Sequence, residues 1–209
     1  DDIAGLGVGG LMMDIATRPH PRAAAAPKVA AVILAAGRSQ RMGGPNKLLA
    51  TLDGRPLVRI VAEAAQASRA AAVVVVTGHR AGDVAAALSD LDVARVHNPG
   101  YADGLSTSLR TGIGALPSDI DAARVLLADM PGVTAATVHR TIDAYDPAAR
   151  QVVVPTHGGR QGNPVLWDRR FFPELTALSG DVGARGLIGR HADVVATVEI
   201  GPEVATDLD

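Results

Sequence analysis

Short aliphatic runs alternate with amphipathic segments from Lys28 to the end of the chain. The aliphatic runs predict strands at residues 29–35, 72–77, 94–97, 123–128, 151–155, 163–167 and 194–200. Helical periodicity, with caps or Pro and Gly breaks, predicts helices at 55–69, 81–89, 104–115, 134–145, 169–178 and 182–190. This order is typical of stacked βαβ units. It predicts a three-layer α/β/α sandwich with a mostly parallel, Rossmann-like sheet.

The stretch before Lys28 lacks this pattern. It begins Gly-rich and continues as TRPHPRAAAAPK, in which prolines and alanines carry no amphipathic period, and it has no initiating Met. We expect residues 1–27 to be a linker, either the tail of an upstream domain or a disordered extension, and residues 28–209 to form one catalytic domain.

Composition narrows the possible functions. Hydrophobic residues make up 47% and aromatic residues 2%, which suits helices packed on a sheet and argues against a stacking platform for nucleic acid. The net charge is -2, whereas nucleic-acid-binding modules are typically basic, so the composition argues against such a module. The absence of cysteine excludes disulfides and thiolate chemistry, and the apolar runs are shorter than the roughly 20 residues of a membrane helix. We expect a cytoplasmic protein with neither nucleic-acid nor membrane partners.

The loop after the first predicted strand, GRSQRMGGPNK, combines glycines with three cations. Ligands of such sheets bind beyond the carboxyl ends of the strands. Gly37 and Gly43 let backbone amides approach a phosphate, and Arg38, Arg41 and Lys47 add positive charge. The alternative is a glycine-rich turn with solvated cations.

A carboxylate ends the fourth predicted strand. In RVLLADMPGVT the aliphatic run stops at Asp129, before a Met-Pro-Gly turn. Carboxylate oxygens suit Mg²⁺, which usually binds through one or two carboxylates plus substrate phosphates. The alternative is that Asp129 only caps the turn. Asp207 and Asp209 follow the last strand and are either a second source of metal carboxylates or a charged terminus.

Hydroxyl groups gather in the segment HNPGYADGLSTSLRTGIG. The third predicted strand ends at His97 and Asn98, and a helix starts near Gly104. Ser106 and Ser108 fall in its first turn, where free N–H groups favour a phosphate or a base carbonyl. Ordinary N-capping would explain one of the two serines.

Two later loops carry weaker signals. In GGRQGNPVLW, Asn163 precedes Pro164 and is restricted to extended backbone, although the segment could be only a hairpin. In SGDVGARGLI, Asp181 is a candidate N-cap with Arg185 four residues on, which could be only an i,i+4 ion pair.

Together, the cationic loop, the strand-end carboxylate and the hydroxyls predict a site for a nucleoside triphosphate and Mg²⁺, with Mn²⁺ as a possible substitute. No Ser-His-Asp or Cys-His arrangement is indicated. None is needed if a substrate phosphate is the nucleophile, because it is already ionised at neutral pH. We expect Lys47 and Arg41 to neutralise the β and γ phosphates, which leave as pyrophosphate, and Mg²⁺ on Asp129 to bridge the α phosphate and its attacker.

Several motifs of the sequence also resemble those of a known protein family. LAAGRSQRMGGPNKLL resembles the signature LAxGxSxRMGxxK of nucleotidyltransferases of GT-A fold, with one extra residue before Lys47. The segments TGHR, VHNPGYADGLSTSLRTGI, LLADMPGVT, GRQGNPVL, GDVGAR and DLD are similar to successive landmarks of the MobA-like molybdenum cofactor cytidylyltransferases. The resemblance covers residues 28–209.

The resemblance implies transfer of CMP from CTP to the terminal phosphate of molybdopterin, giving molybdopterin cytosine dinucleotide and pyrophosphate. It implies catalytic roles for Lys47, Arg41 and Asp129, with Asp129 and Asp209 as metal ligands. The implied nucleotide-binding residues are Leu34, Ala35, Ala36, Gly37, Arg38, Gly78, Asn98, Gly104, Ser106 and Ser108. The implied molybdopterin-binding residues are Gly162, Asn163 and Asp181. A molybdoenzyme of the xanthine dehydrogenase type is implied as a transient partner.

The choice of base depends on one position. Guanylyltransferases of the same fold usually read LAGG, whereas Ala36 stands here in place of the second glycine. We expect its methyl group to leave room for cytosine but not for guanine. A guanylyltransferase, another nucleotidyltransferase acting on a phosphate, and a non-catalytic maturation chaperone remain alternatives. The family usually continues DxDTPED, whereas this sequence stops at Asp209, so a C-terminal metal ligand stays open.

Overall fold

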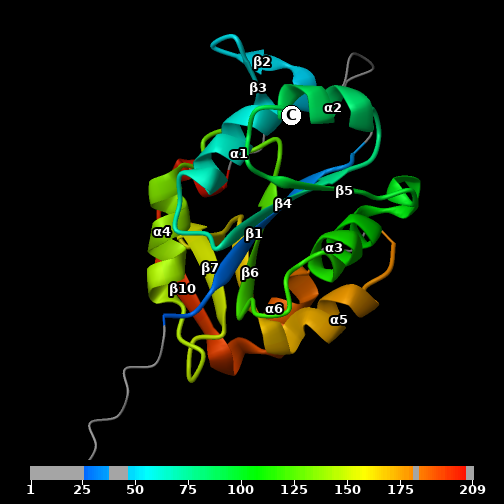
Figure 1. The fold of residues 1–209 in the computed structure, drawn as a ribbon. Coiled ribbons are helices and arrows are strands. Elements are labelled where there is room, and N and C mark those ends of the chain that lie inside the picture. Colours follow the sequence, from blue (N-terminus) through cyan, green and yellow to red (C-terminus); the bar gives the residue numbers. More distant parts are fainter. Residues whose placement is uncertain (1–25, 38–46, 181–183, 206–209) are drawn as a thin grey trace, which may run out of the picture.

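The computed structural model describes residues 26–37, 47–180 and 184–205 (Figure 1). The strands are β1 (Val29–Ala35), β2 (Thr51–Leu52), β3 (Arg55–Pro56), β4 (Ala72–Thr77), β5 (Ala94–His97), β6 (Ala122–Leu127), β7 (Val152–His157), β8 (Arg160–Gln161), β9 (Val165–Asp168) and β10 (Val195–Glu199). The α-helices are α1 (Leu57–Gln66), α2 (Ala81–Ala87), α3 (Leu105–Gly114), α4 (Ala135–Ala144), α5 (Phe172–Ala177) and α6 (Arg185–Arg190). Short 3-10 helices are η2 (Lys47–Leu49), η3 (Tyr101–Asp103), η4 (Arg169–Phe171), η5 (Ala192–Val194) and η6 (Pro202–Val204).

The main sheet runs in the order β10-β7-β9-β6-β1-β4-β5, with β8 beside β7. β1 pairs in parallel with β4 on one side and β6 on the other, while β9 runs antiparallel to β6 and β7. All seven residues of β1 are buried, because both faces of the sheet are covered. The predicted mostly parallel sheet of a three-layer sandwich is confirmed.

Side-chain alternation along β1 explains the two helical layers. Ala31 and Ile33 pack in a core shared with α1, α2 and α4, whereas Val32 and Leu34 pack in a second core with α3, α5 and α6. Successive strand residues point to opposite faces, so one aliphatic run serves both cores. In Figure 1, α1 and α4 accordingly lie on the other side of β1 from α3, α5 and α6.

The predicted elements agree with the observed ones to within a few residues. The helix predicted from residue 55 starts at Leu57, because Arg55 and Pro56 pair with β2 in a short hairpin. The helix predicted at 169–178 is divided into η4 and α5. Strands β2, β3 and β8 were not predicted, since two residues are too few to show a period. Most of the predicted linker lies outside the described residues, so the domain boundary at residue 28 stays a prediction.

Within the described ranges, none of the helices has the length and apolar character needed to cross a membrane.

Candidate active site

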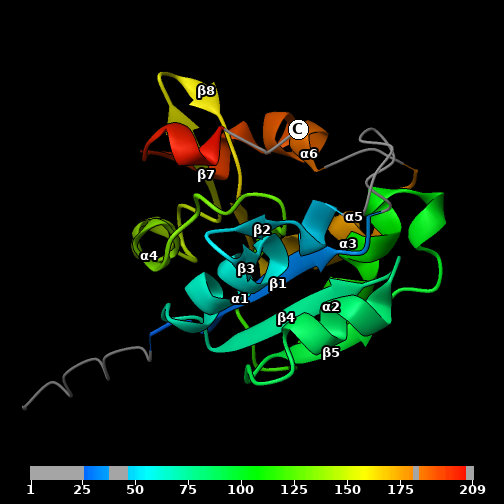
Figure 2. The ribbon, with the colours of Figure 1, turned by 90° about the horizontal axis from the view of Figure 1, so that it is seen from above.

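The carboxyl ends of β1, β4 and β6 lie at the same edge of the sheet, the carboxyl edge, and Figure 2 shows β1 and β4 side by side. Ala35 at the end of β1 pairs with Thr77 at the end of β4, and Leu34 pairs with Leu127 at the end of β6. The Ala128 amide then donates to the Leu34 carbonyl at 3.2 Å. The carboxylate that follows β6 is therefore held beside the start of the cationic loop.

Lys47 and Asp129 form an ion pair at this edge. The Lys47 Nζ lies 3.5 Å from Asp129 Oδ2, and the two side chains are 12% and 28% exposed. Leu48 anchors the lysine by packing in the core, while Asp129 stands between the buried Ala128 and Met130. A partly exposed pair of this kind adds little to stability. The structure brings the two predicted residues together at this edge, and their roles toward a ligand stay predictions.

The donor chemistry at Asp129 fits a divalent cation held jointly with a nucleotide. The described residues contain no group of three or more His, Cys, Asp or Glu side chains that could hold a metal by themselves. A single carboxylate is nevertheless what Mg²⁺ commonly uses when substrate phosphates fill further positions. The Lys47 ammonium lies beside this carboxylate, and its predicted role toward the phosphates stays a prediction.

Gly78 packs directly against Ala36. A Cβ atom at Gly78 would lie 2.7 Å from the Ala36 Cβ, 2.8 Å from its carbonyl oxygen and 2.6 Å from the Tyr101 Cβ. The His79 amide also donates to the Ala36 carbonyl at 3.1 Å. Gly78 is therefore needed for the loop after β4 to close on Ala36, and its direct contact with a nucleotide stays a prediction.

A hydrogen bond joins the buried side chains of Asn98 and Ser108. The Asn98 amide donates to Ser108 Oγ at 3.0 Å and Thr107 Oγ at 2.8 Å, and its oxygen accepts from the Gly100 amide at 3.0 Å. Gly104 begins α3 with a φ of 111°, without a side-chain cap. These contacts hold the loop between β5 and α3. The predicted nucleotide contacts of these residues stay predictions.

Ser106 differs from Ser108. Its side chain is 1% exposed, and its hydroxyl has no hydrogen-bond partner among the described residues. Its amide donates to the Gly180 carbonyl at 3.3 Å, which ties α3 to the loop before α6. A buried hydroxyl without a partner is costly, so Ser106 is a candidate for contact with a bound molecule or water.

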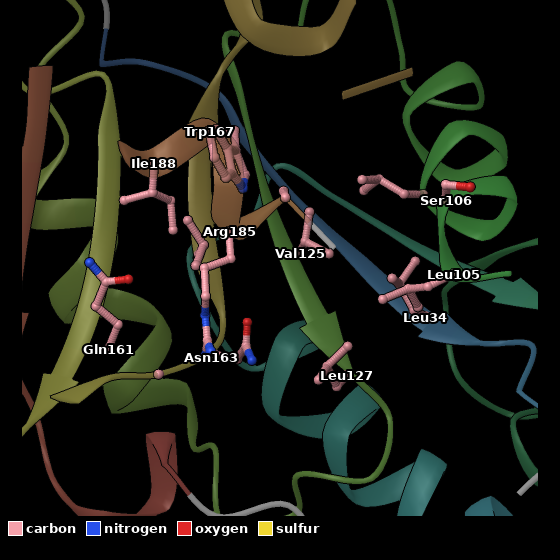
Figure 3. Close-up of a pocket in the computed structure, with 14 residues that line it drawn as sticks. Leu34, Leu105, Ser106, Val125, Leu127, Gln161, Asn163, Trp167, Arg185 and Ile188 are labelled. Atoms are coloured by element: carbon pink, nitrogen blue, oxygen red, sulfur yellow. The ribbon is translucent and has the colours of Figure 1, made fainter. Parts of the chain in front are cut away.

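A cavity of about 320 Å³ opens on the face of the sheet covered by α3 and α6 (Figure 3). Nine of its fourteen lining residues are apolar: Leu34, Leu105, Leu109, Val125, Leu127, Val165, Trp167, Ala184 and Ile188. The others are Ser106, Gln161, Gly162, Asn163 and Arg185. Leu127 of the cavity wall precedes Asp129 by two residues, although neither Asp129 nor Lys47 lines the cavity itself. Apolar walls with a few polar groups are typical of small-molecule sites.

Gly162 and Asn163 are held by the C-terminal part of the fold. The Gly162 amide donates to the Pro155 carbonyl and the Asn163 amide to the Val204 carbonyl, each at 2.8 Å. A Cβ at Gly162 would collide with that Val204 carbonyl oxygen. The Asn163–Pro164 peptide bond is cis. Two of the three predicted molybdopterin-binding residues, Gly162 and Asn163, thus line the cavity, although what they bind stays a prediction.

Five further predicted residues, Arg38, Arg41, Asp181, Asp207 and Asp209, lie outside the described residues, and their roles stay predictions. Sequence reasoning gave no ligand-binding role to the cavity residues Gln161, Trp167 and Arg185. Trp167 belongs to a predicted strand, and an apolar run alone does not indicate which of its residues point toward a cavity. Arg185 was interpreted only as a possible partner of Asp181. The signal available in the sequence was that Arg185 is a charged residue next to the apolar residues of the predicted helix.

Strand β6, which leads to Asp129, also contains a buried arginine. Arg124 is fully buried, and its Nη1 donates to the Val138 carbonyl at 3.0 Å. Its Nε and Nη2 have no partner among the described residues. Desolvation lowers the pKa of Arg124 to about 9, so the group is charged at neutral pH at a cost in stability.

An open α/β sheet with a cation and a carboxylate at the carboxyl ends of its central strands defines a class of phosphate- and nucleotide-binding proteins. The comparisons with known proteins specify the family. Residues 31–194 match the MobA-like NTP transferase domain, and the chain belongs to this nucleotidyltransferase family.

Individual relatives carry different names. The chain is 30% identical over 190 residues to the nicotine blue oxidoreductase of Paenarthrobacter nicotinovorans, covering 88% of this chain and 93% of that protein. It is 29% identical over 137 residues to the molybdenum cofactor cytidylyltransferase of Escherichia coli K12, covering 65% and 67%. The crystal structure of Rv0371c from Mycobacterium tuberculosis matches with a TM-score of 0.73 and 28% identity, covering 84% and 89%. A structure of that protein with manganese has a TM-score of 0.68 and 27% identity, covering 83% and 89%.

Proposed function

We propose that the chain transfers CMP from CTP to the terminal phosphate of molybdopterin, releasing pyrophosphate and forming molybdopterin cytosine dinucleotide. The observation that carries this proposal is the Lys47–Asp129 pair at the carboxyl edge, beside a largely apolar cavity. The pair suits a triphosphate with its metal, and the cavity suits a heterocyclic acceptor. The name of the Escherichia coli relative supports the same reaction.

The reaction needs charge neutralisation and positioning. An oxygen of the acceptor phosphate forms a bond to the α phosphorus of CTP, and the bond from that phosphorus to the bridging oxygen breaks. Pyrophosphate leaves with the electron pair, and no general base is required because the attacking phosphate is already ionised. Lys47, with Arg41 as the predicted second cation, stabilises the charge on the leaving phosphates.

Asp129 is the residue that would hold the metal. A bound Mg²⁺ or Mn²⁺ supplies positive charge to the phosphates of the nucleotide. The manganese in the Mycobacterium tuberculosis structure supports a divalent cation in this fold. Asp209 remains our candidate for a second ligand, and it lies outside the described residues.

The proposed preference for CTP depends on Ala36. Its side chain is buried against Gly78 and Tyr101, so the methyl group cannot move aside for a larger base without shifting the loop after β4. We therefore propose CTP over GTP. We also propose that the product passes, in the cytoplasm, to a molybdoenzyme of the xanthine dehydrogenase type.

The relative from Paenarthrobacter nicotinovorans gives a second candidate, the redox conversion of a heterocycle. The apolar wall with Trp167 would suit such a substrate, with a nicotinamide dinucleotide as hydride donor. The Lys47–Asp129 pair favours nucleotidyl transfer, because a cation beside a carboxylate suits a triphosphate with its metal, whereas hydride transfer involves no triphosphate.

The proposal is tested by pyrophosphate release from CTP, GTP, ATP and UTP in turn, with Mg²⁺ and molybdopterin. We expect release with CTP, its loss with EDTA, and its return with Mg²⁺ or Mn²⁺. Asp129→Asn should raise the metal concentration needed, whereas Asp193→Asn, at an exposed position, should not. Release with GTP alone would indicate a guanylyltransferase. Oxidation of a nicotinamide dinucleotide without pyrophosphate release would indicate the oxidoreductase.

A further inference from the structure

Three polar side chains of the cavity have no partner in the described part of the chain. Gln161, Asn163 and Arg185 line the cavity, and no hydrogen bond or ion pair joins their side chains to other described residues. In Figure 3 the side chains of Arg185 and Asn163 point to the same region of the cavity. Three side chains with hydrogen-bond donors therefore line the same cavity.

Arg185 differs in this respect from the other arginines of the fold. Arg110 donates to the Thr176 and Leu178 carbonyls, and most other described arginines likewise bind a carboxylate or a carbonyl. Among the described residues, only Arg160 and Arg185 lack such a partner. Arg160 is exposed on β8 and does not line the cavity. Arg185 is therefore the arginine that lines the cavity without a partner among the described residues.

The rest of the cavity indicates what the cation would bind. A sugar acceptor needs several hydrogen-bonding groups for its hydroxyls, whereas nine of the fourteen lining residues are apolar. Such walls, with the indole of Trp167 among them, favour a flat heterocycle. A guanidinium forms its strongest hydrogen bonds with the paired oxygens of a phosphate or carboxylate.

We propose that Arg185, with Asn163, binds the phosphate monoester of the acceptor while the heterocycle lies against the apolar wall. This inference rests on the proposed function, and it names the residue that recognises the attacking group. Leu127 lines the cavity two residues before Asp129, so a phosphate bound by Arg185 would approach our proposed metal ligand from the cavity. One of its oxygens then forms the bond to the α phosphorus as pyrophosphate departs.

Binding of two pterins tests this directly, without turnover. The probes are 6-hydroxymethylpterin and its monophosphate, titrated by calorimetry in the absence of nucleotide. Trp167 is the one tryptophan of the sequence, so a change in its fluorescence reports occupation of the cavity. We expect the phosphorylated form to bind the wild-type protein about 10-fold more tightly than the phosphate-free form.

Arg185→Gln should reduce this ratio to about 1, Arg185→Lys should leave an intermediate ratio, and the control Arg160→Gln should preserve it. Circular dichroism shows whether each variant is folded. A ratio unchanged by Arg185→Gln would overturn the inference. Equal weakening of both pterins would also overturn it, because the arginine would then contact the ring.

Turnover separates this inference from the proposed function. Arg185→Gln should raise the KM for molybdopterin about 10-fold and leave the KM for CTP within about 2-fold. If the pterin ratio falls as expected but no nucleotide releases pyrophosphate, the phosphate site stands and the proposed function fails. If pyrophosphate is released and Trp167 fluorescence responds to neither pterin, the proposed function stands and the phosphate site is wrong.

Discussion

Lys47 and Asp129 are 82 positions apart in the sequence, and the fold brings their charged atoms to 3.5 Å. Each was predicted separately, because each follows a strand at the carboxyl edge where ligands bind. Their contact could not be predicted, since it depends on β6 lying directly beside β1. The same limit applies to Arg185, whose place in the cavity depends on how α6 packs.

At the scale of single residues, the account predicts a specific effect of Lys47→Ala. Removing the cation should lower kcat for pyrophosphate release about 100-fold, because charge on the leaving phosphates loses its partner. The control is Lys28→Ala, which removes an exposed lysine paired with Asp119 at the start of β1, away from the carboxyl edge. Steady-state kinetics of both variants would contradict the account if Lys47→Ala kept full turnover.

Arg124 leads to a prediction about stability. Arg124→Met should raise the free energy of unfolding at pH 7 by about 1–4 kcal/mol, because it replaces a buried charge that has no acid partner among the described residues. Urea denaturation measures this change, and Arg95→Met, at an exposed arginine, should have an effect below about 1 kcal/mol.

The pH dependence follows from the direction of the pKa shift. Burial lowers the pKa of Arg124 to about 9, below its ordinary value, so the cost of its charge is fully present below pH 9. Above pH 9 the native state binds fewer protons than the unfolded chain, and the cost declines as the pH rises. The advantage of Arg124→Met should therefore shrink between pH 7 and pH 10. A variant that is less stable than the wild type at pH 7 would show that the arginine is well paired.

At the scale of elements, the hydrophobic pattern predicted where the main strands and helices lie. It could not predict which neighbours each face of an element packs against. The run at β1 predicted a buried strand, and the observed strand has the same bounds. Strand β9 was also predicted, but its antiparallel direction depends on the hairpin-like turn through Gly162 and on pairing with both β6 and β7. Two-residue strands such as β8 form only because a neighbouring strand supplies their hydrogen bonds.

Helix α3 provides a matched test of packing against the sheet. A Cβ at Gly112 would collide with Val32 and lie 2.9 Å from Val76 Cγ2, whereas a Cβ at Gly114 would meet nothing within 4 Å. Gly112→Ala should therefore lower the free energy of unfolding by about 1–3 kcal/mol, because the valines of β1 and β4 are stiff.

Gly114→Ala, two residues on, should change the free energy of unfolding by less than about 1 kcal/mol, in the stabilising direction of helix propensity. Thermal and urea unfolding compare the two variants. Equal effects at both positions would mean that helix propensity, and not contact with the sheet, decides the outcome.

At the scale of the whole molecule, the proposed nucleotide side and the proposed acceptor side of the site come from different parts of the chain. The ion pair joins the loop after β1 to the end of β6, whereas the cavity adds β9, α3 and α6. The family resemblance predicted both sides, because its motifs recur along the domain. The shape of the cavity, with Trp167 as part of its wall, could be known only from the folded sheet.

The central claim is that the α phosphate of CTP becomes bonded to molybdopterin. The most direct measurement follows CTP radiolabelled at its α phosphate through the reaction with Mg²⁺ and molybdopterin, with separation of CMP, CTP and pterin products. The account predicts that the label appears in a pterin dinucleotide in an amount equal to the pyrophosphate released. Label found only in CTP, or in free CMP, would contradict it.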